Sequence, residues 1–423
     1  MIESPQASRY PLLRARLAKN TVTLLLGSAG TTILSLMLSV IIGRNLGENG
    51  LGIYATALAW IAPITLIAEF GLSTLLTREL ATNPQATRSL VNTAIRIRFW
   101  MGTGLSIGLM LAAPFLSEER LIVMGIQLSA VLIWVQPLFS TYTSVFRARQ
   151  AMLPVALLNL GMLLVQVILT WLLLRQAQDV EGVFIINSAT SVLQLFAAWL
   201  IYRWRFRAGK ADFTQAIPLM RQALPFAIAA VLATLHMRLN ILWLEQVWSS
   251  AETGYYAAAS RIPEVARLAS IAFFDAAFPM LVSLAGNERL VSQYLRRMLV
   301  GLSAAGLTFA ITTGIAGPFV MLFLFGEAFS NAIEPMIILS WAIIPLLIRS
   351  TLTFYGYVQR DEAFVNSTVF IALFGRLLFC ALLIPPYGAS GAALAHLAAE
   401  TCGMLLLAGR HLPINWLRIS TRP

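Results

Sequence analysis

The chain has 423 residues, of which 58% are hydrophobic and 12% are charged, and its mean hydropathy is +0.76. This mixture is far from the roughly half apolar, quarter charged composition of a water-soluble domain. It excludes a soluble fold and predicts an all-α membrane protein.

Twelve apolar segments of spanning length follow one another along the chain. A hydrocarbon core about 30 Å thick needs about 20 apolar residues per helix, so about twelve helices use nearly all of the chain. The first run, from Thr21 to Ile42, is too long for the core of a signal peptide and is predicted to remain as a span. We expect spans near 20–43, 51–76, 95–116, 121–145, 153–174, 182–202, 222–247, 255–284, 298–325, 333–358, 363–385 and 389–409.

Basic residues gather in alternate loops. If the N-terminus is cytoplasmic, the inner loops hold most of the arginines and lysines, among them Arg78 and Arg98, and the outer loops hold only Arg44, Arg120 and Arg175. The outer loops instead carry acidic residues, including Glu48, Glu252, Glu327 and Glu334. This positive-inside pattern predicts that both termini are cytoplasmic. The net charge of +11 and the pI near 10.2 therefore report topology, and we expect no nucleic-acid partner.

An internal repeat divides the chain. The segment 50–57 is echoed at 252–259, so that Gly52 matches Gly254. Weaker echoes follow in the same order at an offset of roughly two hundred residues, pairing 134–137 with 341–345, 146–150 with 357–361, and 182–189 with 391–398. We therefore predict an N-terminal six-helix bundle at 1–205, a cytoplasmic linker at 206–221 and a C-terminal six-helix bundle at 222–423. An even number of spans in each half gives a parallel repeat.

Short glycine-rich motifs carry a resemblance to a known family. They are the segments 43–54, 68–72, 77–81, 252–256 and 387–395. In their order and spacing, the chain resembles the polysaccharide and lipid-linked oligosaccharide flippases of the multidrug/oligosaccharidyl-lipid/polysaccharide exporter superfamily. Members of this family often have Asp where this chain has Glu69, which keeps the charge on a longer side chain.

This resemblance implies a fold and a substrate. The two bundles would form a V around a central cavity, and the substrate would cross by alternating access. Flippases of this family move undecaprenyl-diphosphate-linked sugars for surface polysaccharide biosynthesis in the bacterial inner membrane. The expected partners are the lipid-linked oligosaccharide, membrane lipids, a polysaccharide polymerase and glycosyltransferases. We expect a monomer that needs no cofactor beyond a coupling ion, H⁺ or Na⁺.

Charged groups within a span are costly, so each needs a partner or a function. Arg376 and Glu400 come out at similar depth on the last two spans, and we predict a structural ion pair between them. Arg261, Glu264 and Arg267 follow one another at i, i+3 spacing along one helical face. Glu264 and Arg267 form a local pair in the simpler interpretation, and the remaining arginine faces either a wet cavity or an anionic substrate.

Four arginines are candidates for a phosphate-binding site. The guanidinium group is a planar fork of donors that suits phosphate oxygens and remains charged when partly desolvated. Arg238, Arg261 and Arg349 lie within predicted spans, and Arg44 lies at the end of the first span. The alternative for Arg44 is an interfacial residue whose side chain reaches water.

Two carboxylates are candidates for coupling transport to an ion, and two histidines are not. Glu69 and Asp275 lie near the predicted inner ends of their helices, and the alternative is a structural pairing with Arg78 or with loop arginines. His236 and His396 are isolated in the sequence, and we predict that they are hydrogen-bonded packing residues rather than proton relays.

Two other functions compete with flipping of a lipid-linked sugar. The first is a cation-coupled drug or metabolite exporter of the same superfamily, whose cavity would favour carboxylates and aromatic faces over arginine. The second is a membrane polysaccharide polymerase or glycosyltransferase, which would need a long loop with a catalytic site. No loop here is long enough, and the sequence shows no metal-ligand cluster or P-loop, so we predict that the protein is not an enzyme.

Overall fold

The structure, a computed structural model, describes residues 10–82, 87–177, 179–205, 216–283 and 288–412. Every secondary-structure element in these ranges is a helix. The chain divides into two compact units, one comprising residues 1–45 and 57–235 and the other residues 46–56 and 236–423. Of the predicted linker at 206–221, residues 206–215 lie outside the described ranges, and the two six-helix bundles stay a prediction.

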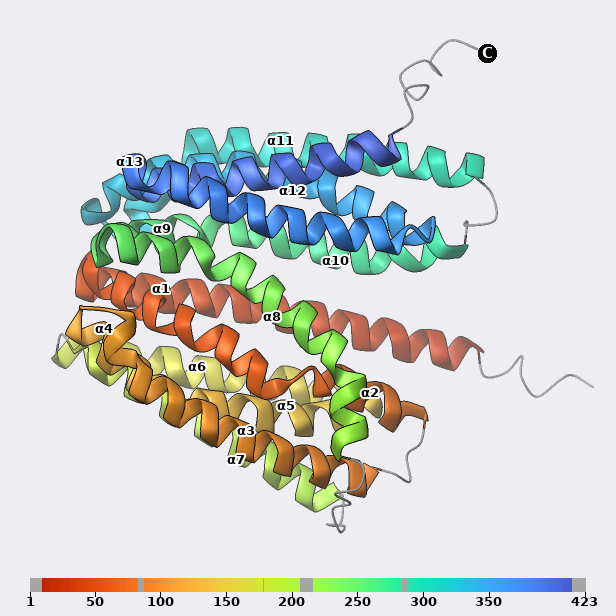
Figure 1. The fold of residues 1–423 in the computed structure, drawn as a ribbon, viewed down its shortest axis with the longest axis horizontal. Coiled ribbons are helices and arrows are strands. Elements are labelled where there is room, and N and C mark those ends of the chain that lie inside the picture. Colours follow the sequence, from red (N-terminus) through yellow and green to blue (C-terminus); the bar gives the residue numbers. More distant parts are fainter. Residues whose placement is uncertain (1–9, 83–86, 178, 206–215, 284–287, 413–423) are drawn as a thin grey trace, which may run out of the picture. The chain divides into compact units, whose positions relative to one another are not determined.

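Unit 1 is built mainly from the N-terminal helices, which Figure 1 colours from red to yellow-green. Leu72, Leu75, Leu76 and Leu80 recur at helical spacing along α2, and all four are fully buried. They form one core cluster with residues of α3, α5, α6, α7 and α8, including Phe146. The helices that contribute to unit 1 are α1 (Tyr10–Glu69), α2 (Leu72–Thr82), α3 (Thr87–Leu116), α4 (Arg120–Ser129), α5 (Leu132–Ala148), α6 (Met152–Gln176), α7 (Val180–Arg205) and the first part of α8 (Ala216–Val247).

Unit 2 combines the rest of α8 with the C-terminal helices and with residues 46–56 of α1. Helices α11, α12 and α13 run side by side (Figure 1). The buried Asn240 on α8 donates hydrogen bonds to Tyr256 Oη on α9 and to the carbonyl of Ala392 on α13, both at 2.8 Å, and so ties three helices together. The C-terminal elements are α9 (Ser250–Ala259), α10 (Arg261–Ser283), α11 (Glu288–Phe325), the 3₁₀ helix η4 (Glu327–Ala332), α12 (Ile333–Val358) and α13 (Glu362–His411).

Two helices are too long for a single membrane crossing. Helix α1 has 60 residues and α13 has 50, which at 1.5 Å per residue is about two to three times a 30 Å hydrocarbon core. Each is broken at a glycine with positive φ, Gly47 at 69° and Gly388 at 54°. Gly47 falls between the first two predicted spans and Gly388 between the last two. Both breaks therefore lie where the sequence predicts a boundary between spans.

Other predicted spans are interrupted. The span expected at 51–76 ends at Glu69, because Phe70 and Gly71 take φ values of 52° and 63° before α2 begins. The span expected at 121–145 is divided into α4 and α5, and the one at 255–284 into α9 and α10. Within the described residues, nine helical segments are long and apolar enough to cross a membrane. The total of twelve stays a prediction.

Gly52 and Gly254, the glycines matched by the repeat, pack against each other within unit 2. A Cβ atom on Gly52 would lie only 2.7 Å from the carbonyl carbon of Ser250 and 2.9 Å from the nitrogen of Gly254. A Cβ atom on Gly254 would lie 2.8 Å from the carbonyl carbon of Glu48. The contact is reciprocal, since Glu48 and Ser250 occupy matching repeat positions four residues before their glycines. Only glycine allows the two helix backbones to approach this closely.

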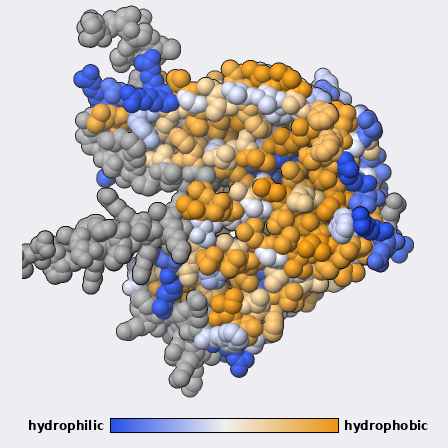
Figure 2. All heavy atoms as spheres, turned by 180° about the vertical axis from the view of Figure 1, so that it is seen from behind, coloured by the Kyte–Doolittle hydropathy of each residue, from blue (hydrophilic) through white to orange (hydrophobic). Residues whose placement is uncertain are grey.

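Large apolar side chains cover much of the exterior. Phe115 is 89% exposed, Ile315 79% and Phe319 73%. Figure 2 shows apolar residues over most of the described surface in view, with hydrophilic residues gathered toward its margins. Apolar surface of this extent needs lipid around it, because water would drive it to aggregate. The protein is a multi-pass membrane protein.

Candidate functional site

The break at the end of α1 holds a polar cluster in unit 1. Glu69 is the last residue of α1, and its side chain is 22% exposed. Its Oε1 accepts hydrogen bonds from Ser73 on α2 and, at 2.7 Å, from Ser140 on α5. The positive φ values at Phe70 and Gly71 turn the chain so that Ser73 reaches back to this carboxylate.

Arg98 on α3 organises this cluster from inside the protein, with no exposed side-chain surface. Its Nη1 donates to the carbonyl of Pro137 at 2.8 Å and to Thr141 Oγ1 at 2.5 Å. Its Nη2 donates to the carbonyl of Glu69 at 3.2 Å and to Ser73 Oγ at 2.8 Å, and lies 3.8 Å from Glu69 Oε1. The guanidinium thus joins α1, α2, α3 and α5.

One prediction about this region is wrong. Arg98 is expected in a cytoplasmic loop, but the structure buries it, because the Glu69 carboxylate and the carbonyls of Glu69 and Pro137 solvate its charge. Of the partners considered for Glu69, Arg78 instead pairs with its neighbour Glu79 at 3.2 Å on the surface, and Arg98, counted among the loop arginines, lies beside Glu69. The signal that could have identified Arg98 is its place three residues inside the apolar segment predicted at 95–116.

A second cluster surrounds Glu400 in unit 2. This carboxylate is 4% exposed and lies 2.7 Å from Arg349 Nε, 3.7 Å from Arg376 Nη2 and 3.8 Å from His236 Nε2. Arg376, 1% exposed, also donates to the carbonyl of His236 at 2.8 Å and bonds the Nδ1 of His396. The structure thus brings Arg376 and Glu400 together. It adds to this pair Arg349, His236 and His396, which the sequence does not link to it.

Both histidines belong to this cluster, so they are not isolated, but His396 is hydrogen-bonded to Arg376 as expected of a packing residue. His396 lies on α13 one helical turn before Glu400, and His236 lies on α8. Arg349 reaches Glu400 from α12 because its side chain crosses α13 over Gly403, where a Cβ atom would lie 2.8 Å from Arg349 Cδ. With neutral histidines, two arginines and one glutamate leave the cluster with one surplus positive charge.

A third cluster lies at the start of α10 in unit 2. Glu264 accepts from Arg261 Nη1 at 3.2 Å and from Arg267 Nη2 at 3.3 Å, so one carboxylate contacts both arginines. Arg238 on α8 is half-buried and within electrostatic range of all three side chains. Three guanidinium groups and one carboxylate give these four side chains a summed charge of +2. We call Arg238, Arg261, Glu264 and Arg267 the arginine cluster.

Two other candidates remain, Arg44 and Asp275. Arg44 on α1 belongs to unit 1 and has an exposed side chain. Asp275 is part of α10, but its side chain lies outside the described ones. Within the described residues, no group of three or more His, Cys, Asp or Glu side chains could hold a metal ion.

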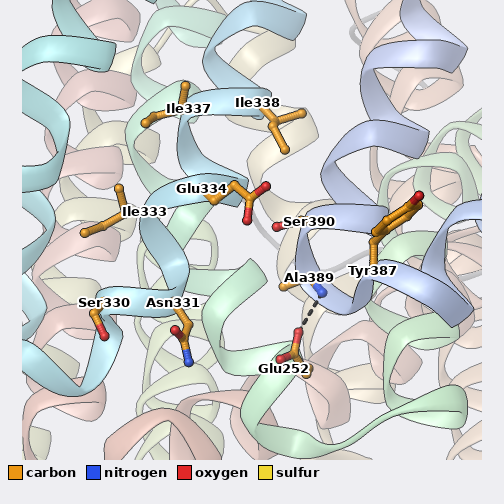
Figure 3. Close-up of a pocket in the computed structure, with 10 residues that line it drawn as sticks. All are labelled: Glu252, Ser330, Asn331, Ile333, Glu334, Ile337, Ile338, Tyr387, Ala389 and Ser390. Carbon is orange, nitrogen blue, oxygen red and sulfur yellow. Dashed lines mark hydrogen bonds between the residues drawn. The ribbon is translucent and has the colours of Figure 1, made fainter.

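Unit 2 also contains an open pocket of about 590 Å³. Figure 3 shows residues from α9, η4, α12 and α13 around it. Glu252 lies on one wall, where its Oε2 accepts a hydrogen bond of 2.6 Å from the backbone nitrogen of Ala389, just after the break at Gly388. This bond fixes the wall that α13 contributes.

Comparison with known protein families identifies the family of this chain. Residues 17–285 match the family described as polysaccharide biosynthesis protein. The chain belongs to this family. The resemblance predicted from the glycine-rich motifs is therefore confirmed. No curated protein sequence matches the chain.

The fold of this polysaccharide biosynthesis protein is that of the same transporter superfamily. The lipid II flippase MurJ in an inward closed conformation has a TM-score of 0.75 at 14% identity, over 91% of this chain and 86% of that one. An inward-facing multidrug resistance MATE transporter of the MOP superfamily has a TM-score of 0.73 at 12% identity, over 92% and 96%. A MOP superfamily transporter from Pyrococcus furiosus has a TM-score of 0.65 at 11% identity, over 96% and 95%. At these identities the likeness shows the fold alone.

Proposed function

We propose that this protein is an alternating-access flippase that moves a polyprenyl-diphosphate-linked oligosaccharide across the bacterial inner membrane for surface polysaccharide biosynthesis. The observation that carries the proposal is the arginine cluster, in which Glu264 pairs with Arg261 and Arg267 and the half-buried Arg238 adds a third positive charge. The family and the transporter fold support a role in polysaccharide export.

A diphosphate is the ligand whose chemistry fits the cluster. Charge-assisted hydrogen bonds from a planar guanidinium to phosphate oxygens are about twice as strong as neutral ones. A local charge of +2 in a half-buried site is costly until an anion neutralises it. A bound diphosphate with two negative charges therefore neutralises the cluster and removes the electrostatic free-energy cost of its positive charge. A cationic drug would instead add to the positive charge.

The remaining candidates take supporting roles in this proposal. Arg349 adds a 28% exposed guanidinium held by Glu400 to the positively charged groups of unit 2, and Arg44 receives the headgroup at the end of the first span. Glu69 and Asp275 are the proposed coupling carboxylates, because protonation or Na⁺ binding changes their charge during the cycle. Glu69 suits this role because its carboxylate stays partly exposed while Arg98 holds it in place.

Binding of the headgroup tests the proposal directly. The purified full-length protein in lipid nanodiscs is titrated with a polyprenyl-diphosphate disaccharide and with the matching polyprenyl disaccharide that lacks the diphosphate. Replacing Arg238 or Arg261 by Ala should weaken binding of the diphosphate lipid roughly tenfold to a hundredfold, the equivalent of one charged hydrogen bond. Binding of the phosphate-free lipid should not change.

Two further variants sharpen the test. Glu264→Gln raises the local charge from +2 to +3 and should tighten diphosphate binding, with a steeper dependence on salt. Arg289→Ala, an exposed arginine on α11 away from the cluster, is the matched control and should leave binding unchanged. Equal affinities of Arg238→Ala, Arg261→Ala and the unaltered protein for the diphosphate lipid would refute the phosphate site.

A further inference from the structure

The open pocket in unit 2 has a size and lining unlike those of the arginine cluster. Its volume of about 590 Å³ lies within the range of about 300–1,000 Å³ that small-molecule sites occupy. Two carboxylates, Glu252 and Glu334, line it together with polar side chains that include Asn331 and Ser390. No basic side chain is among its lining residues.

Most of the pocket's polar groups are available to a ligand. Glu252 uses one oxygen to accept the backbone N–H of Ala389. Among the described residues, Glu334 and Asn331 make no side-chain hydrogen bond or ion pair, and in Figure 3 the Glu334 carboxylate lies near Ser390 at the open centre. Carboxylate oxygens accept hydrogen bonds and the Asn amide both donates and accepts, a combination that recognises vicinal hydroxyl groups.

Apolar groups form the rest of the lining. Ile333, Ile337 and Ile338 come from the first turns of α12, and the exposed ring of Tyr387 stands on the opposite wall (Figure 3). A sugar ring has a polar rim of hydroxyl groups and an apolar C–H face. A pocket with acceptors at its centre and an aromatic ring at its side matches both features.

The charge of the pocket limits which sugars it accepts. With both carboxylates ionised and no cation in the lining, the pocket repels phosphate and uronic acids. It favours neutral sugars and sugars that carry a free amino group. Such a pocket complements the arginine cluster of the same unit, which suits the anionic diphosphate and leaves the glycan to a different site.

We propose that this pocket binds neutral or amino-bearing sugar units of the transported glycan. The proposal deepens the flippase function and rests on it. In the loop-charge topology, Glu252 and Glu334 lie at the ends of spans opposite to the basic loops, which is the outer side. The pocket thus receives the glycan as it emerges, and holding it there favours forward transport.

Binding of free sugars tests the pocket without any transport step. The full-length protein in nanodiscs is examined by saturation-transfer NMR with a panel of neutral, amino and uronic-acid disaccharides. At least one neutral or amino disaccharide should bind, and uronic-acid disaccharides should not. Glu334→Gln and Tyr387→Ala should each weaken that binding tenfold or more. Glu327→Gln is the matched control, since it removes a carboxylate from η4 outside the pocket lining and should have no effect.

Several results would overturn the proposal. They are no binding across the panel, preference for uronic acids, equal affinity in Glu334→Gln, or binding of Ca²⁺ alone at the two glutamates. The test is separate from the flippase proposal, because Arg238→Ala should keep its affinity for free sugars. Sugar binding without diphosphate binding would therefore support the sugar pocket and refute the phosphate site. Diphosphate binding without sugar binding would support the phosphate site and refute the sugar pocket.

Discussion

The reciprocal contact between Gly52 and Gly254 makes a specific prediction about stability. Alanine at either position places a methyl group less than 3.0 Å from backbone atoms of the other helix, a separation that real Cβ atoms do not show. Backbone cannot rotate away as a side chain can, so the helices must separate. Overpacking of this kind costs about 1–3 kcal/mol, and we expect the upper end, about 3 kcal/mol, for Gly52→Ala and for Gly254→Ala.

The assay is thermal unfolding of the purified protein in detergent, followed by fluorescence-detected size exclusion. Gly301→Ala on α11 is the control, because its Cβ position meets nothing within 4 Å beyond its chain neighbours and its own helix backbone, and it should leave stability unchanged or slightly raised. The double variant should lose less than the sum of the single ones, since one separation relieves both clashes. Unfolding temperatures of both single variants equal to that of Gly301→Ala would refute the close backbone contact.

Two buried ionic clusters give further predictions. Arg98→Ala leaves Glu69 without its guanidinium and should lower the free energy of unfolding by about 3–5 kcal/mol, measured by denaturant titration in detergent. The exposed Arg96, replaced by Ala, should show a small effect, and equal losses at the two positions would contradict the burial of Arg98. In a double-mutant cycle, Glu400→Gln and Arg349→Gln should show a coupling energy of about 1–3 kcal/mol. Additive losses would mean that the 2.7 Å ion pair does not form.

The sequence anticipated features whose physical cause is local or periodic. Apolar segments and loop charges identified a membrane protein, and the glycine repeat marked Gly52 and Gly254 before their contact was known. The breaks at Gly47 and Gly388 fell between predicted spans, because polar, glycine-rich turns separate apolar runs.

Other features depend on which faces of the helices pack against each other. The sequence gives the depth of a residue along its helix but not the helix face that contacts a neighbour. Depth alone placed Arg376 level with Glu400, yet Arg349 on α12 makes the shorter contact because Gly403 leaves room for its side chain. Arg98 was misassigned because an arginine near the end of a span has the same sequence signature as a topology-setting loop charge.

Movement of the lipid-linked sugar itself is the most direct test of the central claim. The full-length protein is reconstituted into vesicles that carry a fluorescent polyprenyl-diphosphate oligosaccharide in the inner leaflet, and a membrane-impermeant quencher reports its arrival in the outer leaflet. We expect a rise in quenching above that of protein-free vesicles, and a loss of that rise with Arg238→Ala in correctly inserted protein. Quenching at the protein-free rate, or an unchanged rate in Arg238→Ala, would contradict the central claim.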